Sequence, residues 1–166
     1  MHRGVWATAA WVLVLAVWTG GCAMRGQPDG SASAGAAPLK GTAWVLTSLR
    51  GEPLPPRPAD WADRNAPSLE FDAEGKRVSG GAGVNRFFAP VTLATGVVGA
   101  TGGTGRLEFG NAGSTMMAGP EDLMTLERRY LETLRQVRRF EVKDGRLRLL
   151  GGAGEELATF VPAKTP

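Results

Sequence analysis

From Lys40 onward, one stretch of the sequence has the apolar spacing of a helix, and the segments around it have the spacing of strands. Within Pro120–Val137, apolar residues recur every three or four positions and form one stripe, at Leu123, Leu126, Tyr130, Leu134 and Val137. Charged residues occupy the opposite face. A single amphipathic helix has to bury its stripe against another layer, which here can only be a sheet.

Both ends of this predicted helix carry favourable residues. Proline suits the first helical position, and Glu121 and Asp122 follow it at the positive end of the helix dipole. Arg135, Arg138 and Arg139 form a small basic cluster at the other end. We expect this cluster to lie near the negative helix terminus. Contact with anionic lipid headgroups is the alternative role.

Alternation of apolar and polar residues predicts strands over most of the remaining domain. The segments are Thr42–Leu49, Ser68–Asp72, Lys76–Ser79, Asn85–Leu93, Arg106–Phe109 and Glu156–Val161, with a hairpin around Asp144-Gly145. Ala94–Gly105 is predicted to be a flexible connection, and no βαβ rhythm is present. We therefore expect an α+β, mainly β fold: a curved, mostly antiparallel sheet or open barrel closed by one amphipathic α-helix.

Cysteine and histidine are almost absent. Cys22 is the only cysteine and His2 the only histidine among 166 residues, so the chain cannot assemble Ser-His-Asp or Cys-His catalysis, or the usual zinc sites. We expect a protein that is not an enzyme and has no cofactor and no metal. The formal net charge of +3 is spread among interspersed acidic and basic residues, which argues against a nucleic-acid partner. We expect a monomer.

The N-terminal segment has the features of an export signal, which we place at residues 1–21. Arg3 precedes the uncharged stretch Val5–Trp18, which is shorter than the roughly 20 apolar residues of a spanning helix. Thr19-Gly20-Gly21-Cys22 resembles a bacterial lipobox, although leucine is usual where Thr19 stands. We predict lipidation at Cys22. An ordinary cleaved signal with an incidental cysteine and an uncleaved anchor are the alternatives.

Residues 22–39 follow as the lipidated cysteine and a tether. The stretch Ala23–Pro38 is rich in Gly, Ala and Ser and has little to bury, so we expect a flexible spacer between membrane and domain. Ala23 stands where aspartate would retain a lipoprotein in the inner membrane. We therefore expect a cell-envelope protein, anchored in the outer membrane by its N-terminal lipid and facing the periplasm.

Two motifs carry a family resemblance. Val78–Phe87 (VSGGAGVNRF) is similar to the G-x-x-G-C-N-R-F core of the META (HslJ-like) domain family, and Ser114–Pro120 (STMMAGP) to its S/T-R-M-A-C segment. The resemblance extends over residues 40–162 through Trp44, the helix and the hairpin. It implies a bacterial envelope protein, commonly a lipoprotein and in some members linked to stress, with no established enzymatic activity.

The sequence also departs from the family pattern. Val84 and Gly119 replace the two family cysteines, and Met116 replaces the arginine of the second motif. Any function of the family that needs those thiols or that arginine is in doubt here. We hypothesise that positions 84 and 119 are neighbours in the fold, so that the family's thiols can pair across them.

Few side chains are candidates for a site. Asn85 and Arg86 follow the glycine cluster Gly80–Gly83 and offer directed hydrogen-bond donors for binding. The alternative, which we favour for Asn85, is that it hydrogen-bonds nearby backbone where the chain turns. Met117 and Met124 are expected in the core. The carboxylates of Glu70, Asp72, Glu121 and Glu127 are interpreted as surface charge.

These observations predict a non-enzymatic envelope lipoprotein whose domain braces or binds another component of the envelope. A role under stress is part of what the resemblance implies. The alternative is a carrier that holds a lipid tail or small apolar ligand in a cavity between the sheet and the helix.

Overall fold

The computed structural model describes residues 39–62, 64–99 and 102–164. Contacts divide the chain into two units, Met1–Ser31 and Ala32–Pro166, and every described residue belongs to the second. The predicted signal peptide, Cys22 and the spacer up to Pro38 lie outside the described residues.

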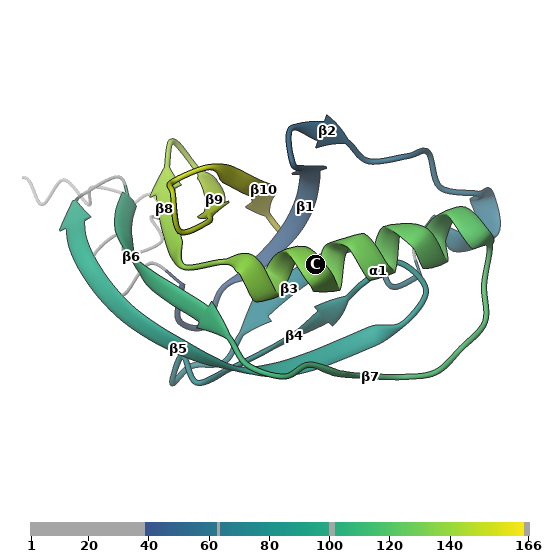
Figure 1. Cartoon of the computed structure of the whole chain (residues 1–166), viewed down its shortest axis with the longest axis horizontal. Coiled ribbons are helices and arrows are strands. Elements are labelled where there is room, and N and C mark those ends of the chain that lie inside the picture. The colour runs from purple at the N-terminus through teal and green to yellow at the C-terminus, as the bar shows by residue number, and fades with distance from the viewer. Residues whose placement is uncertain (1–38, 63, 100–101, 165–166) are drawn as a thin grey trace, which may run out of the picture. The chain divides into compact units, whose positions relative to one another are not determined.

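The described part contains ten strands, one short 3-10 helix and one α-helix (Figure 1). Along the chain they are β1 Ala43–Leu49, β2 Glu52–Pro53, η1 Ala59–Trp61, β3 Ser68–Phe71, β4 Arg77–Gly81, β5 Arg86–Gly99, β6 Gly102–Phe109, β7 Gly113–Ser114, α1 Glu121–Gln136, β8 Arg139–Lys143, β9 Arg146–Leu150 and β10 Glu156–Pro162.

Eight of the strands form a closed antiparallel barrel in the order β1-β3-β4-β5-β6-β8-β9-β10. The ring closes because β1 also pairs with β10, from Trp44↔Pro162 to Leu49↔Ala158. The sequence leaves a curved sheet and an open barrel as alternatives, and this pairing between the two ends of the domain decides for a barrel. The short strands β2 and β7 add to β1 and β5.

The apolar stripe of α1 is buried, as its periodicity predicts: Leu123, Leu126, Tyr130, Leu134 and the following Val137 are at most 4% exposed. Tyr130 packs edge-on against Phe87 with ring centroids 5.9 Å apart, and its hydroxyl donates to the Ser68 carbonyl at 3.1 Å. Burial raises the pKa of Tyr130 well above its usual value. An eight-stranded barrel is just wide enough for side chains to fill it, and here they do.

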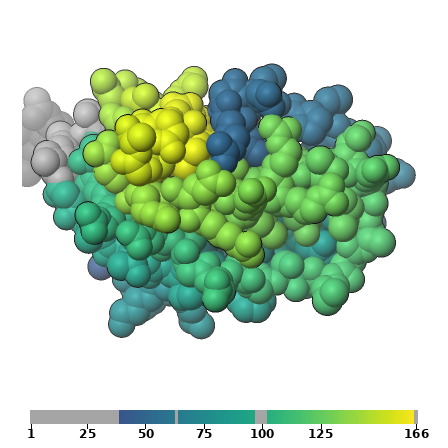
Figure 2. Space-filling model, in the orientation of Figure 1, coloured from purple at the N-terminus to yellow at the C-terminus, as the bar shows by residue number. Residues whose placement is uncertain are grey.

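The outer face of α1 forms part of the molecular surface, between the C-terminal strands and the strands β5 and β6 (Figure 2). Its last turn is stabilised by Arg138, whose Nη1 donates to the carbonyls of Arg135 at 2.9 Å and Val137 at 2.7 Å. Of the basic cluster, Arg138 therefore supports the helix terminus, as expected. Among the described residues, no helix combines the length and the apolar character that a membrane span requires.

The flexible connection predicted at Ala94–Gly105 is wrong for the described residues of this stretch, which belong to two strands. Strand β5 continues to Gly99 and β6 begins at Gly102, with pairs that include Ala94↔Arg106 and Val98↔Gly103. The glycines that suggested flexibility make room for neighbours instead. A Cβ at Gly105 would lie 2.6 Å from Cε1 of Phe140 on β8, so only glycine lets that ring cover the strand.

The hairpin predicted from Asp144-Gly145 is confirmed. Strands β8 and β9 pair on either side of it, and both turn residues have positive φ, 51° at Asp144 and 69° at Gly145. Two consecutive residues with positive φ match the type I′ turn, whose twist suits an antiparallel pair.

Candidate functional site

Both sequence motifs meet around Asn85, at the point where β4 leads into β5. Asn85 is 3% exposed, and its side chain is fully engaged within the protein. Its Nδ2 donates to Glu127 Oε1 at 3.0 Å and to the Met117 carbonyl at 3.2 Å. Its Oδ1 accepts from Met117 N at 2.7 Å and from the Thr115 hydroxyl at 2.8 Å. The geometry supports the structural role for Asn85, since no polar atom of this side chain is left for a ligand.

Glu127 is the acidic partner of this cluster, and its assignment to the surface is wrong. It is 7% exposed, and its Oε2 accepts from the backbone N–H of Val84 at 3.2 Å and of Asn85 at 2.7 Å. Position 127 lies one residue after Leu126 of the apolar stripe, so its side chain borders the buried face of α1. The carboxylate reaches the glycine-rich turn because Gly83, with φ 138°, brings the backbone close to the helix.

Arg86 lies on the other side of the chain from Asn85. Successive residues of a strand face opposite sides, so burial of Asn85 places the Arg86 side chain on the outer surface, where it is exposed. Of the two predicted binding residues, only Arg86 is therefore available to a partner. Its backbone N–H donates to Oγ1 of Thr115, a residue of the second motif, at 3.2 Å.

Val84 and Gly119 are in contact, as the neighbour hypothesis expects. A Cβ placed on Gly119 would lie 2.7 and 2.9 Å from the two γ carbons of Val84, and 3.0 Å from the ring of Trp61. Val84 is fully buried. The isopropyl group of Val84 therefore occupies the space beside Gly119 and helps fix the chain that leads into α1.

Arg57 holds the loop between β2 and β3 in place, a role that the sequence did not reveal. Its Nε and Nη2 donate to the Trp61 carbonyl at 3.0 and 2.8 Å, and Nη2 also reaches the carbonyls of Arg64 and, at 3.1 Å, Gly83. One guanidinium thus ties the loop that carries Trp61 and Arg64 to the glycine-rich turn. Desolvation lowers the pKa of Arg57 from its usual value.

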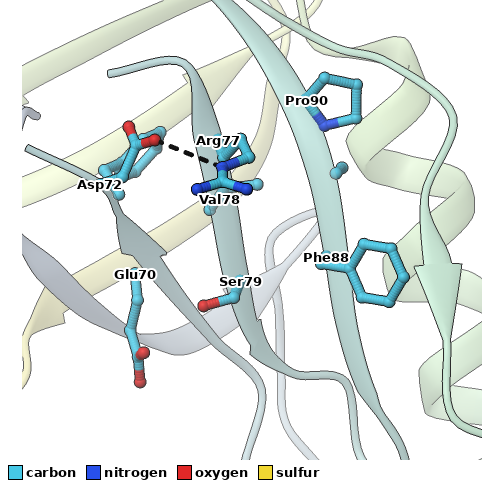
Figure 3. A pocket seen from close by; sticks show the side chains of 9 residues that line it. Glu70, Asp72, Arg77, Val78, Ser79, Phe88 and Pro90 are labelled. Atoms are coloured by element: carbon cyan, nitrogen blue, oxygen red, sulfur yellow. Dashed lines mark ion pairs between the residues drawn. The ribbon is translucent and has the colours of Figure 1, made fainter. Parts of the chain in front are cut away.

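The outer face of β3, β4 and β5 has a hollow of about 460 Å³, which we call the Phe88 hollow. The register aligns Glu70, Ser79 and Phe88 across the three strands, and Figure 3 shows their side chains in that order. Ser79 is small, so the surface dips between Glu70 and the ring of Phe88. Pro90 extends the apolar side along β5.

An ion pair closes one end of the Phe88 hollow. Arg77 Nε lies 3.7 Å from Asp72 Oδ2 (Figure 3). Lys76 N donates to Asp72 Oδ1 at 2.7 Å. Desolvation acts to raise the pKa of Asp72, but backbone N–H groups of Lys76, Arg77 and Gly75, together with the charge of Arg77, outweigh it and lower the pKa. Asp72 is therefore an ionised, fixed group at this rim.

A second hollow, of about 600 Å³, also has Glu70 in its lining, and we call it the Trp61 hollow. Because Glu70 lines both, we call the two hollows together the outer trough. Arg86, Arg64 and Met117 also line the Trp61 hollow. The outer trough therefore combines apolar side chains with arginines in both hollows and with the carboxylates of β3.

Exposed apolar side chains take part in both hollows, Phe88 in the first and Met117 in the second. Among the described residues, the large hydrophobic side chains classed as exposed are Phe88 at 66%, Met116 at 99% and Met117 at 47%. The expectation that Met117 packs in the core is wrong, because Asn85 binds its backbone and turns its side chain outward.

Together these features define a small barrel domain closed by one helix, with a hollowed outer face. The chain belongs to the META domain family, whose model matches residues 37–164. It is similar to an NMR structure of a protein from Burkholderia xenovorans, with 26% identity and a TM-score of 0.52 over 84% of this chain and 99% of the other.

A second NMR structure is similar with 22% identity and a TM-score of 0.51, over 74% of this chain and 90% of the other. Both of those chains are covered almost completely, so in each of them the domain is nearly the whole folded chain. No curated protein matches this chain.

One sequence feature, the pair Phe87-Phe88, indicates that an aromatic ring lies on the outer face of the barrel. Phe87 and Phe88 are consecutive residues of a predicted strand, and alternation requires them to face opposite sides. Phe87 is 1% exposed and Phe88 is 66% exposed. In contrast, Trp61 ends the short helix η1 and Arg64 follows it before β3, and Arg57 binds the backbone carbonyls of both. Within the described ranges, no group of three or more His, Cys, Asp or Glu side chains is placed to hold a metal ion.

Proposed function

We propose that this protein is a non-enzymatic lipoprotein of the bacterial envelope whose META domain binds another envelope component. The observation that carries the proposal is the outer trough, in which the exposed side chains of Phe88 and Met117 take part and beside which Met116 follows in the chain. The hydrophobic core of the barrel does not include these three side chains. A partner that covers them removes apolar area from water.

The location rests on the N-terminal sequence. A short apolar segment ends at Cys22 and is followed by a spacer rich in Gly, Ala and Ser, which is the arrangement of a lipid-anchored domain. Lipid anchorage would hold the domain close to the membrane while the spacer lets the outer trough reach a partner. The same reasoning supports the outer membrane and the periplasm as the location, since Ala23 follows the cysteine.

The proposal is favoured over a carrier function by where the hollows lie. The Phe88 and Trp61 hollows are on the outer face of the barrel. The interior space that a lipid tail would need holds Tyr130, Phe87 and Phe160, each at most 1% exposed. A carrier would have to displace these rings, and each is a large part of the packed core.

Membrane anchorage is tested by replacing Cys22. The variant Cys22→Ser, produced in a bacterial host, should leave the membrane fraction or accumulate as an unprocessed precursor, whereas the parent labels with radioactive palmitate. A variant that is processed and remains in the membrane fraction like the parent contradicts the lipoprotein proposal.

Binding of an envelope component is tested by site-specific photocrosslinking in intact cells. A benzophenone amino acid at position 88 should give a discrete adduct, and the same group at the exposed position 146 on the β8–β9 hairpin serves as the matched control. Arg86→Glu in the background of the position-88 probe should reduce the adduct. The same adducts from both positions, or none from position 88, contradict the proposal.

A further inference from the structure

The outer trough has a shape that follows from the register of three strands. Ser79 of β4 lies between Glu70 of β3 and Phe88 of β5. The next outward position on β4 is Gly81, which pairs with Arg86 and is covered by the backbone of Asn65 and Ala66. The open surface therefore lies over Ser79 and along the outward side chains of β5, Arg86 and Phe88. An extended chain that follows β5 would contact both of these side chains.

The side chains along one wall have a regular spacing. Arg86 and Phe88 are two residues apart on β5, so they lie on the same face about 7 Å from each other. An extended polypeptide also presents its i and i+2 side chains on one face at about this distance. An acidic residue and an apolar residue separated by one position would therefore meet Arg86 and Phe88 together.

The charges of the trough select among classes of partner. Glu70 lines both hollows and Asp72 lies at the rim, which disfavours a nucleic acid or another polyanion. A lipid tail has no charged or polar group that could pair with Arg86 or Glu70. A polypeptide supplies apolar groups and both signs of charge, and it is the class whose chemistry complements the whole trough.

The closed barrel also dictates how such a segment is recognised. Because β1 pairs with β10, the ring of eight strands has no free edge to which an incoming strand could add. Recognition therefore depends on side chains and not on backbone pairing. The sequence of the bound segment then determines affinity.

We propose that the outer trough binds an extended segment of a partner protein through an acidic–x–apolar motif, with the acidic side chain on Arg86 and the apolar side chain between Phe88 and Pro90. This inference rests on the proposed function, because it takes the bound envelope component to be a protein. It adds the form in which that protein is recognised and the residues that recognise it.

The test uses residues 37–164, which hold the described core and the whole family match, and which correspond to domains that fold as nearly complete chains in the similar structures. The probe is a displayed library of random linear 12-residue peptides. Enriched peptides should carry the acidic–x–apolar motif. One of them, synthesised with a fluorophore, should bind at least tenfold more weakly to Arg86→Glu and to Phe88→Ser than to the parent.

A charge exchange makes the test specific. Replacing the acidic residue of the peptide with lysine should abolish binding to the parent and restore it to Arg86→Glu. Arg146→Glu on the β8–β9 hairpin is the control and should bind like the parent. Arg86 and Phe88 are both exposed, so the melting temperatures of all variants should agree within a few degrees.

Several outcomes overturn the inference. The inference fails if no peptide is enriched, or if Arg86→Glu and Phe88→Ser leave peptide binding unchanged. It also fails if the domain self-associates and Phe88→Ser abolishes that self-association. Vesicle binding that depends on Phe88 would also overturn it, in favour of lipid. A photocrosslinked adduct at position 88 without any peptide binding would leave the proposed function standing and reject only the linear motif.

Discussion

Glu127 and Asn85 hold the helix against the β4–β5 turn through two hydrogen bonds of one carboxylate. Asn85 N donates to Oε2 at 2.7 Å and Asn85 Nδ2 donates to Oε1 at 3.0 Å. Both residues are buried, at 7% and 3% exposure. Because Asn85 also binds Met117, this pair connects the two sequence motifs and positions the loop beside the outer trough.

Replacing Glu127 with alanine should destabilise the domain by about 2–4 kcal/mol, because buried N–H groups of Val84 and Asn85 lose their acceptor. Glu127→Gln should cost less, since one oxygen remains. Urea unfolding measures both changes. Glu132→Ala, at an exposed position of the same helix, is the control and should change the free energy of unfolding by less than about 0.5 kcal/mol. Equal effects at 127 and 132 would show that the buried carboxylate has no structural role.

The apolar stripe of α1 gives a second prediction. Leu134 is 2% exposed, so Leu134→Ala should cost about 2–5 kcal/mol through lost burial and the cavity that remains. Arg128→Ala on the exposed face should cost little. Chemical denaturation of the two variants compares them directly, and small, similar losses would mean that α1 does not close the core as described.

Val84 and Gly119 are close enough to be linked. The double variant Val84→Cys/Gly119→Cys should form a disulfide under oxidising conditions, since disulfides hold their Cβ atoms about 3.5–4.5 Å apart and these positions are in contact. Closing this loop should add about 3–4 kcal/mol in the chain-entropy model, less any strain. Gly119→Ala alone should be destabilising, because its Cβ would meet Val84 at 2.7 Å.

Thiol counting and thermal melting of the oxidised double variant provide the measurement. The reduced variant is the matched control, as it has the same side chains without the bond. Two free thiols in a folded, oxidised protein would contradict the contact between the β4–β5 turn and the segment that leads into α1.

The rim of the trough should respond to acid. The pKa of Asp72 is lowered in the folded state, so its contribution to stability is present above the unfolded value of about 3.9 and is lost as the pH falls through the folded value. Asp72→Asn should therefore be less stable than the parent near pH 7, and the difference should disappear once the pH is below the lowered pKa of Asp72 in the folded protein. Urea unfolding across this range checks it, with the exposed neighbour Glu74→Gln as control. A difference that does not depend on pH would contradict the role of the ionised carboxylate.

Much of the fold was contained in local patterns of the sequence. The stripe from Leu123 to Val137 predicts the helix and its buried face, because 3.6-residue periodicity fixes which side chains point inward. Asp144-Gly145 predicts the last hairpin, because few residues accept positive φ at two consecutive positions. The glycines of Ala94–Gly105, in contrast, did not predict one local structure. The lack of a side chain suits a flexible link as well as the strand that Phe140 covers, and only the neighbour distinguishes them.

Closure of the barrel and the composition of its outer face were decided by the tertiary structure. The pairing of β1 with β10 joins segments at opposite ends of the domain, and no local pattern specifies it. Glu127 has the sequence context of a surface carboxylate and is buried because the Asn85 turn supplies three hydrogen-bond donors. The outer trough arises in the same way. Alternation determines that Arg86 and Phe88 face outward together, but the approach of Glu70 and Trp61 to them depends on strand register and on the Arg57 contacts, which exist only once the chain has folded.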